Sequence, residues 1–551
     1  MFLIYLNVSY SFVDLMNNLN KLKYINSYKL MGIPAYFSHI IKKYNKILQS
    51  LQIDIDNLYL DSNSIIYDAF NQLRKDGKDN SPDIEKYLIE NTCKKIDEYI
   101  KTVKPSKRVI IAFDGIAPVA KLEQQRIRRH RTWFTKELSN SFEKNNKESW
   151  STSFITPGTQ FMDKLNKYII DYYKNSNIVI VSGSNIPGEG EHKIFEYIRT
   201  NNHKNQNTLV YGLDADLIML CLNHISVHEN LFLFRETPEF VRQIDSSLDP
   251  NKSYMLNIPE LAKAIINEIH LTNNNSKEIK DNRIKDYIFL CFFLGNDFLP
   301  HFPALNIRTN GIDILLDVYK NTLGITDETI IQDNTIVWKN LRSIIKKISK
   351  EEHNYFLEEH AKRKKREKRF FPTHTLEDKL DKLNSIPSIY REDEIYINPD
   401  EKGWEYRYYK RLFDLKIDDT RRKQICTNYL EGIEWTFKYY IKECYDWKWK
   451  YKYNYPPLLT DLIEYIPYFD TEFIPLQKKD PVQSQTQLIY VLPYDNLYML
   501  NKETYNNISH KLTKWYNNNY KFTWAYCKYF WESHIHLPEI NIDEVERLIS
   551  S

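Results

Sequence analysis

Short apolar runs that end in or run into an acidic turn recur through the first half of the chain, and a helix-like segment follows each of them. The runs are NLYLD (57–61), RVIIAFD (108–114), NIVIVSGS (177–184) and TLVYGLDAD (208–216). Strands that alternate with helices are typical of a parallel sheet with crossover helices. The pattern therefore predicts an α/β fold, with a mostly parallel central sheet flanked by helices, over residues 31–345.

The pattern changes in the second half of the chain. Dense aromatic residues, as in WTFKYYIKECYDWKWKYKYNYPP (435–457), predict a second, mainly helical region over residues 396–500 that packs against the sheet region. We interpret the charged stretch before it as a linker, with a nuclear signal as the alternative interpretation of HAKRKKREKRF. The remaining segments are a leader that is either disordered or mistranslated and a C-terminal segment without a readable motif, which gives the boundaries 1–30, 31–345, 346–395, 396–500 and 501–551.

Composition narrows the class of protein. The 551 residues carry a formal charge of only +3, from 76 basic and 73 acidic side chains, so charge is expected to segregate locally. The six cysteines form no CxxC pair, which argues against a zinc site or a disulfide scaffold and favours an intracellular protein of the nucleus or cytoplasm. No apolar stretch approaches the roughly 18 residues of a membrane span, and we expect no membrane contact.

The acidic residues follow the predicted strands. Another acid comes after the apolar run FLCFFL, which could be a buried helix, and two more lie in the glycine-rich turn IPGEGEHK. Ligands of parallel sheets bind beyond the carboxyl ends of the strands, so one shared site is expected. The acids concerned are Asp61, Asp114, Glu189, Glu191, Asp214, Asp216 and Asp297.

Carboxylates crowded at one sheet edge repel one another unless cations lie between them. Oxygen-only ligands favour hard ions, and pairs of such ions are the catalytic centres of many nucleases and polymerases. We therefore expect two Mg²⁺ ions, with Mn²⁺ as a substitute. Taken singly, each acid is also compatible with a helix N-cap or an exposed surface carboxylate.

A basic helix is predicted directly after Asp114. Its polar residues are spaced so that several share one face, and arginine binds two phosphate oxygens at once. A plain basic surface helix is the alternative. The predicted phosphate clamp consists of Lys121, Gln125, Arg128 and Arg129.

These motifs together resemble the XRN family of 5'→3' exoribonucleases. The similar segments are MGIPAYFSHII (31–41), DSNSIIYDAF (61–70), FDGIAPVAKLEQQRIRRHR (113–131), IPGEGEHKI (186–194), YGLDADLIML (211–220) and FLGNDFLPHFP (293–303). Residues 429–462 and 487–493 resemble the second conserved region of the family. The resemblance runs, with gaps, from Met31 to about Pro493 and implies a core like that of PIN and flap nucleases.

The resemblance also implies roles. All of the acids above fall on the family's metal ligands, and the clamp residues fall on its pocket for a 5'-monophosphate. The implied activity is processive degradation of single-stranded RNA to 5'-mononucleotides, with the second region closing over the site. Where the family usually has a histidine that stacks on the 5' base, this chain has Tyr67; candidates for a second stacking residue include Trp435, Trp447 and Trp449.

Two other functions remain as alternatives. One is a structure-specific DNA nuclease of the flap type, which shares the acidic core. The other is a catalytically inactive RNA-binding scaffold, although none of the family's acids is missing. The resemblance implies single-stranded RNA with a 5'-monophosphate as the partner molecule and leaves the natural RNA targets and protein partners open.

Overall fold

A computed structural model describes residues 35–143, 150–212, 214–234, 254–475, 479–516 and 520–550. The predicted leader and Met31 lie outside this range. Within it, every helix is too short or too polar to span a bilayer. The division into a leader, a catalytic region, a linker, a second region and a C-terminal segment stays a prediction.

The expected parallel sheet is present. Its strand order is β1-β7-β6-β5-β2-β3-β4, and the five strands from β6 to β4 in this order run parallel to one another. The β7 strand pairs antiparallel with both β6 and β1, so one edge of the sheet is mixed. The strand bounds are β1 (Leu48–Ser50), β2 (Asn57–Asp61), β3 (Arg108–Ala112), β4 (Val179–Ser182), β5 (Thr208–Tyr211), β6 (Leu231–Phe234) and β7 (Tyr254–Asn257).

Helices cover both faces of the sheet because its central strands are apolar on both sides. Leu58 and Leu60 of β2 pack into one core cluster, whereas Tyr59 between them packs into the other. This is the two-residue alternation of a strand. One face carries α3 (Asn63–Lys75), α4 (Ile84–Val103) and α6 (Gln160–Tyr173); the other carries α2 (Tyr36–Lys43), α7 (Gly190–Thr200), α8 (Ala215–His224), α10 (Ile258–Ile269) and α11 (Lys277–Cys291).

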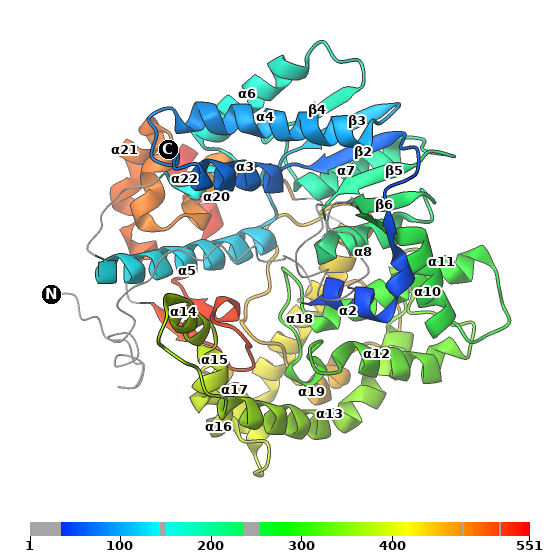
Figure 1. Ribbon diagram of the computed structural model, residues 1–551. Helices are drawn as coiled ribbons and strands as arrows, with labels where there is room; N and C mark the ends of the chain where they lie inside the picture. The colour runs from blue at the N-terminus through cyan, green and yellow to red at the C-terminus, as the bar shows by residue number, and fades with distance from the viewer. Residues whose placement is uncertain are drawn as a thin grey trace.

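The second region is mainly helical and packs against the sheet region, as predicted. Tyr429, Ile433 and Phe437 of α18 (Asp419–Ile441) belong to the same core cluster as residues of the sheet and of α8. Figure 1 shows these helices below the sheet, with the long α13 (Trp338–Glu367) along the bottom of the molecule. The other helices of this half are α12 (Gly311–Tyr319), α14 (Leu376–Asn384), α15 (Ile386–Ile389), α16 (Glu392–Ile397), α17 (Trp404–Leu412) and α19 (Leu459–Tyr465).

The α5 helix (Val119–Glu143) runs from the left edge of the molecule to its centre in Figure 1, below α3 and above α14 and α15. Residues from the end of the chain hold it in place. Arg126 donates to the carbonyl of Pro538 at 2.7 Å, and Arg131 donates to the carbonyl of Ser533 at 2.8 Å. The elements of this end of the chain are α20 (Ser484–Val491), α21 (Lys502–Ile508), β10 (Lys521–Thr523), β11 (His534–His536) and α22 (Ile542–Ser550).

A buried ion network ties α13 to the end of the chain. Glu394 accepts hydrogen bonds from Arg363 at 2.8 Å and from Arg391 at 2.6 Å, and all three side chains are buried. Arg363 also donates to the carbonyl of Cys527 at 2.7 Å, and the backbone amide of Tyr526 donates to Glu394 at 2.9 Å. The basic stretch on α13 therefore includes an arginine that belongs to the interior.

Replacing Arg363 with leucine should lower the free energy of unfolding by about 3–5 kcal/mol, because Glu394 then keeps a buried charge with one cation fewer. The matched control is Lys364→Leu, next in the helix and exposed, for which we expect a change within about 0.5 kcal/mol. Urea denaturation of both variants measures the difference. Equal effects in the two variants would contradict a structural role of this network.

Candidate active site

The predicted acids are brought to one edge of the sheet. Asp61 ends β2, Asp114 follows β3, and Glu189 is the N-cap residue of α7. Asp214 is the N-cap residue of α8 and accepts a hydrogen bond from the Leu217 amide at 3.1 Å. These positions follow from the parallel topology, in which the carboxyl ends of neighbouring strands lie together.

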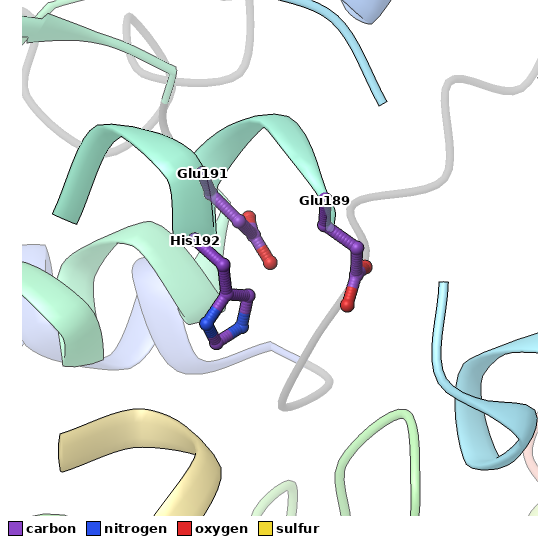
Figure 2. A group of neighbouring side chains, drawn as sticks. All are labelled: Glu189, Glu191 and His192. Carbon is purple, nitrogen blue, oxygen red and sulfur yellow. The ribbon is translucent and has the colours of Figure 1, made fainter. Parts of the chain in front are cut away.

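The glycine between the two glutamates lets α7 begin against the ends of β2 and β3. The Gly190 amide donates to Asp114 Oδ1 at 2.8 Å. A Cβ atom at position 190 would lie 2.6 Å from Asp61 Oδ1, so a side chain here would force the Asp61 carboxylate to shift. Figure 2 shows the carboxylates of Glu189 and Glu191 on the same side of the start of α7, with the His192 imidazole beside them.

Two overlapping groups of side chains have the spacing of metal ligands. Asp61, Glu191 and Asp214 each offer one oxygen within 4.8 Å of the others, and Glu189, Glu191 and His192 form a similar group. Asp61 Oδ1 is buried and has no hydrogen-bond partner among the described residues. A buried carboxylate oxygen without a donor fits a hard divalent cation, which binds through oxygen ligands.

The electrostatics of the cluster also favour a bound divalent cation. Burial raises the pKa of Asp61 well above its ordinary value, and the carboxylates of Asp114 and Asp214 raise this pKa further. Burial likewise raises the pKa of Asp216 well above its ordinary value, and Asp297 adds to the effect. It is therefore unfavourable for all of these acids to be ionised at once, and bound cations would stabilise the ionised cluster.

Lys121 is the cation that the chain itself supplies to the cluster. Its ammonium lies 2.5 Å from Glu189 Oε2 and 2.8 Å from Asp297 Oδ2, and the side chain is buried. Burial lowers the pKa of Lys121, but the carboxylates of Asp297 and Glu189 outweigh burial and hold this pKa well above its ordinary value. This residue of the predicted clamp thus lies among the predicted metal ligands.

The other clamp residues follow Lys121 along α5. Gln125, Arg128 and Arg129 are half-buried, and the Nε atom of Arg129 is buried without a hydrogen-bond partner in the described part of the chain. Burial lowers the pKa of Arg129 to about 10, opposed by an electrostatic interaction with Tyr67 of α3. Tyr67, half-buried, is therefore near the guanidinium of Arg129.

Several polar residues at the site were not among the predicted ones. Asn63 donates to Asp114 Oδ2 at 2.5 Å, and Gln124, the neighbour of the predicted Gln125, donates to Asp297 Oδ1 at 3.3 Å. From the second region, the hydroxyls of Tyr439 and Tyr440 donate to Glu189 Oε1 at 2.9 Å and to Asp216 Oδ1 at 2.5 Å. The sequence signal was present only as aromatic density in 435–457, without a reason to single out these two residues.

The three candidate tryptophans differ in exposure. Trp435 and Trp449 are buried and stack on each other with ring centroids 5.2 Å apart, as expected of core packing. Trp447 is half-buried, and its carbonyl accepts a hydrogen bond of 2.8 Å from the Val119 amide at the start of α5. Of the three, Trp447 is the one with surface available for a base.

Divalent metal should stabilise the protein, and its removal should make stability depend on pH. With EDTA present, the free energy of unfolding should fall as pH rises above the ordinary carboxyl pKa values of 3.8 and 4.5, because the folded-state pKa values of Asp61, Glu191 and Asp216 are raised. Mg²⁺ at 100 times its dissociation constant should restore about 2.7 kcal/mol. Thermal unfolding with and without Mg²⁺ measures both effects.

Asp214→Asn tests whether this stabilisation comes from the cluster. Asparagine can still cap α8 but removes one of the repelling charges, so the metal-free variant should be at least as stable as the unaltered protein while losing most of the gain from Mg²⁺. The control is Asp171→Asn, an exposed acid on α6, which should keep the full gain. A full gain in Asp214→Asn would show that Mg²⁺ acts elsewhere.

Comparison with known proteins supports the family resemblance that the sequence motifs indicated. Residues 31–237 match the family described as the XRN 5'-3' exonuclease N-terminus, and residues 278–392 and 388–550 match the Xrn1 helical domain. The 5'-3' exoribonuclease 2 of Arabidopsis thaliana is 26% identical over 95% of this chain and 67% of its own length. The 5'-3' exoribonuclease 1 of Saccharomyces cerevisiae is 28% identical over 84% of this chain and 39% of its own length.

A further relative, the 5'-3' exoribonuclease 2 of Candida albicans, is 31% identical over 60% of this chain and 40% of its own length. The match to the chain thus spans two thirds of the plant relative and about 40% of each of the two yeast relatives. The two family matches together cover residues 31–237 and 278–550, and they include the acids at the sheet edge and the helix α18 that carries Tyr439 and Tyr440. The chain belongs to the XRN family of 5'→3' exoribonucleases.

Proposed function

We propose that this protein is a processive 5'→3' exoribonuclease that hydrolyses single-stranded RNA with a 5'-monophosphate and releases 5'-mononucleotides. The observation that carries the proposal is the convergence of the acids from β2, β3, α7 and α8 on one buried cluster, beside the basic face of α5. The names of the relatives support the reaction class. The 5'-monophosphate preference rests on the clamp residues.

The proposed cofactor is a pair of Mg²⁺ ions. When bound, two such ions activate a water and stabilise the attacking and leaving oxygens of a phosphodiester. Asp61, Glu191 and Asp214 would hold one ion, since their oxygens lie close together and one of them lacks a donor. The proposed ligands for the second ion are Glu189, Asp216 and Asp297, and Asp114 completes the set with oxygens already oriented by Gly190 and Asn63.

The clamp supports recognition of a terminal phosphate. Arg129 is a half-buried cation whose buried Nε has no acceptor among the described residues, and a phosphate dianion would supply charge and acceptors together. Lys121, at the inner end of the same helix face, is shared between the clamp and the acids. A 5'-hydroxyl end would bring no anion to Arg129 and would leave its Nε without an acceptor.

A flap-type DNA nuclease and an inactive RNA-binding scaffold remain the competing functions. One RNA prepared with a 5'-monophosphate, a 5'-triphosphate or a 5'-hydroxyl, together with a DNA strand of the same sequence and a DNA flap, separates all three. The proposal expects stepwise loss of mononucleotides from the monophosphate RNA. Cleavage of the flap alone would favour the first alternative, and binding without cleavage in Mg²⁺ would favour the second.

Arg129→Ala should narrow the preference for the 5'-monophosphate over the 5'-hydroxyl. One charge-assisted hydrogen bond contributes about 1.5–3 kcal/mol, or roughly 10- to 150-fold in rate. The matched control is Lys136→Ala, an exposed cation further along α5, which should keep the preference. Initial rates on the three RNA ends measure the effect, and an unchanged ratio in Arg129→Ala would refute the clamp.

Tyr67 is proposed to stack on the 5' base, as the corresponding histidine does in the family. Stacking on an aromatic ring is worth about 1–3 kcal/mol per base, so Tyr67→Ala should slow degradation and shorten processive runs. Tyr67→Phe and Tyr67→His keep an aromatic ring and should change the degradation rate and the length of processive runs only slightly. Tyr67 also packs against the core under α3, so the thermal unfolding temperature must be measured beside the rate. A variant that only unfolds earlier, with normal rates, would assign Tyr67 to packing.

A further inference from the structure

The C-terminal part of α18 places two consecutive tyrosines against the acid cluster. Tyr439 and Tyr440 are both buried, and they lie about 250 and 224 residues along the chain from the carboxylates that they contact. The Tyr439 hydroxyl donates to Glu189 Oε1 at 2.9 Å, and the Tyr440 hydroxyl donates to Asp216 Oδ1 at 2.5 Å. Two proposed metal ligands thus receive hydrogen bonds from the second region.

These hydrogen bonds fix the direction of each carboxylate. Glu189 is held from two sides, because Tyr439 donates to one oxygen while the Lys121 ammonium lies 2.5 Å from the other. A carboxylate oxygen has two acceptor positions, so a phenol and a cation can bind the same oxygen together. The tyrosine contacts therefore orient the carboxylates without occupying them.

The tyrosine rings are themselves held in place. Tyr439 stacks on the His192 imidazole with centroids 3.7 Å apart and planes 18° apart, and it also contacts the ring of Trp435 at 5.1 Å. His192 comes from the start of α7, next to Glu191 (Figure 2). Tyr440 packs edge-on against Phe292 at 5.1 Å, and its carbonyl accepts from Asn223 of α8 at 3.1 Å. Each hydroxyl is thus delivered by a ring that has little freedom to move.

We propose that Tyr439 and Tyr440 are positioning residues of the metal centre, which hold the carboxylates of Glu189 and Asp216 in the direction that binds metal. The inference rests on the proposed function, since it requires Glu189 and Asp216 to bind metal. Groups that hydrogen-bond to metal ligands orient them, and losing such a group typically costs 10- to 100-fold in metal affinity or activity. The second region then contributes to metal binding itself, in addition to any part in enclosing RNA.

The test is a titration with Mn²⁺, followed by the electron paramagnetic resonance signal of the free ion, on the full chain without RNA. Tyr439→Phe and Tyr440→Phe remove only the hydroxyl, and each should weaken Mn²⁺ binding roughly 10- to 100-fold. The matched control is Tyr408→Phe, a buried tyrosine of α17 whose hydroxyl donates to the Pro456 carbonyl at 2.9 Å, in a different core cluster. Tyr408→Phe should bind Mn²⁺ as the unaltered protein does.

Thermal unfolding of the EDTA-treated variants separates positioning from folding. A fall in unfolding temperature shared by all three variants, with Mn²⁺ affinity reduced only in Tyr439→Phe and Tyr440→Phe, supports the inference. Unchanged Mn²⁺ affinity in both of these variants overturns it while leaving the proposed function intact. Asp214→Ala distinguishes the remaining case: if it binds Mn²⁺ as tightly as the unaltered protein, the acids are not the metal site, and both proposals fail.

Discussion

The contact of the Lys121 ammonium with Glu189 and Asp297 is the interaction on which the rest of the site depends. Removing a charged group from water costs several kcal/mol per ion, and here acids from β2, β3, α7, α8 and the segment after α11 are brought together in one place. Lys121 links two of these segments, which are far apart in sequence, by placing one buried cation between the carboxylates of Glu189 and Asp297. The chain supplies part of the compensating charge, and the remaining repulsion is what makes a divalent cation favourable.

The second region is part of this compensation. Its helix α18 shares a core cluster with the sheet and with α8, and its tyrosine hydroxyls reach Glu189 and Asp216. A region that only covered the site could move away without altering the hydrogen bonds or the orientation of the acids. Here any displacement of α18 would remove hydrogen-bond donors from buried carboxylates, which is costly because such groups have no water to replace the lost partner. Core packing and the geometry of the site are therefore coupled.

The sequence predicted those features that depend on local pattern. Four strands of the parallel sheet, β2 to β5, are marked by apolar runs, and the acids near them converge because parallel strands end at the same edge. The parallel β6 was not predicted, because no acid follows it among the candidates. The antiparallel β1 and β7 were not predicted. The β1 strand has only three residues, and the apolar run of β7 does not end in an acid. The partners of the acids were also beyond prediction: Lys121 was assigned to phosphate on spacing, and Tyr439 and Tyr440 are two of 41 tyrosines. Which face of α18 meets the acids depends on tertiary packing, and helical period alone does not reveal it.

The α5 helix connects the acid cluster to the clamp as a rigid element. Lys121 and Arg129 are separated by two turns, which corresponds to about 12 Å along the helix axis at 1.5 Å per residue. The helix cannot slide, because Arg126 and Arg131 are bonded to carbonyls near the end of the chain. Under the proposed function, a 5'-phosphate held at Arg129 would place the acids at a constant distance along the RNA. Each cleavage would then occur at the same distance from the 5' end, so that a single helix would set both the direction and the step of the proposed degradation.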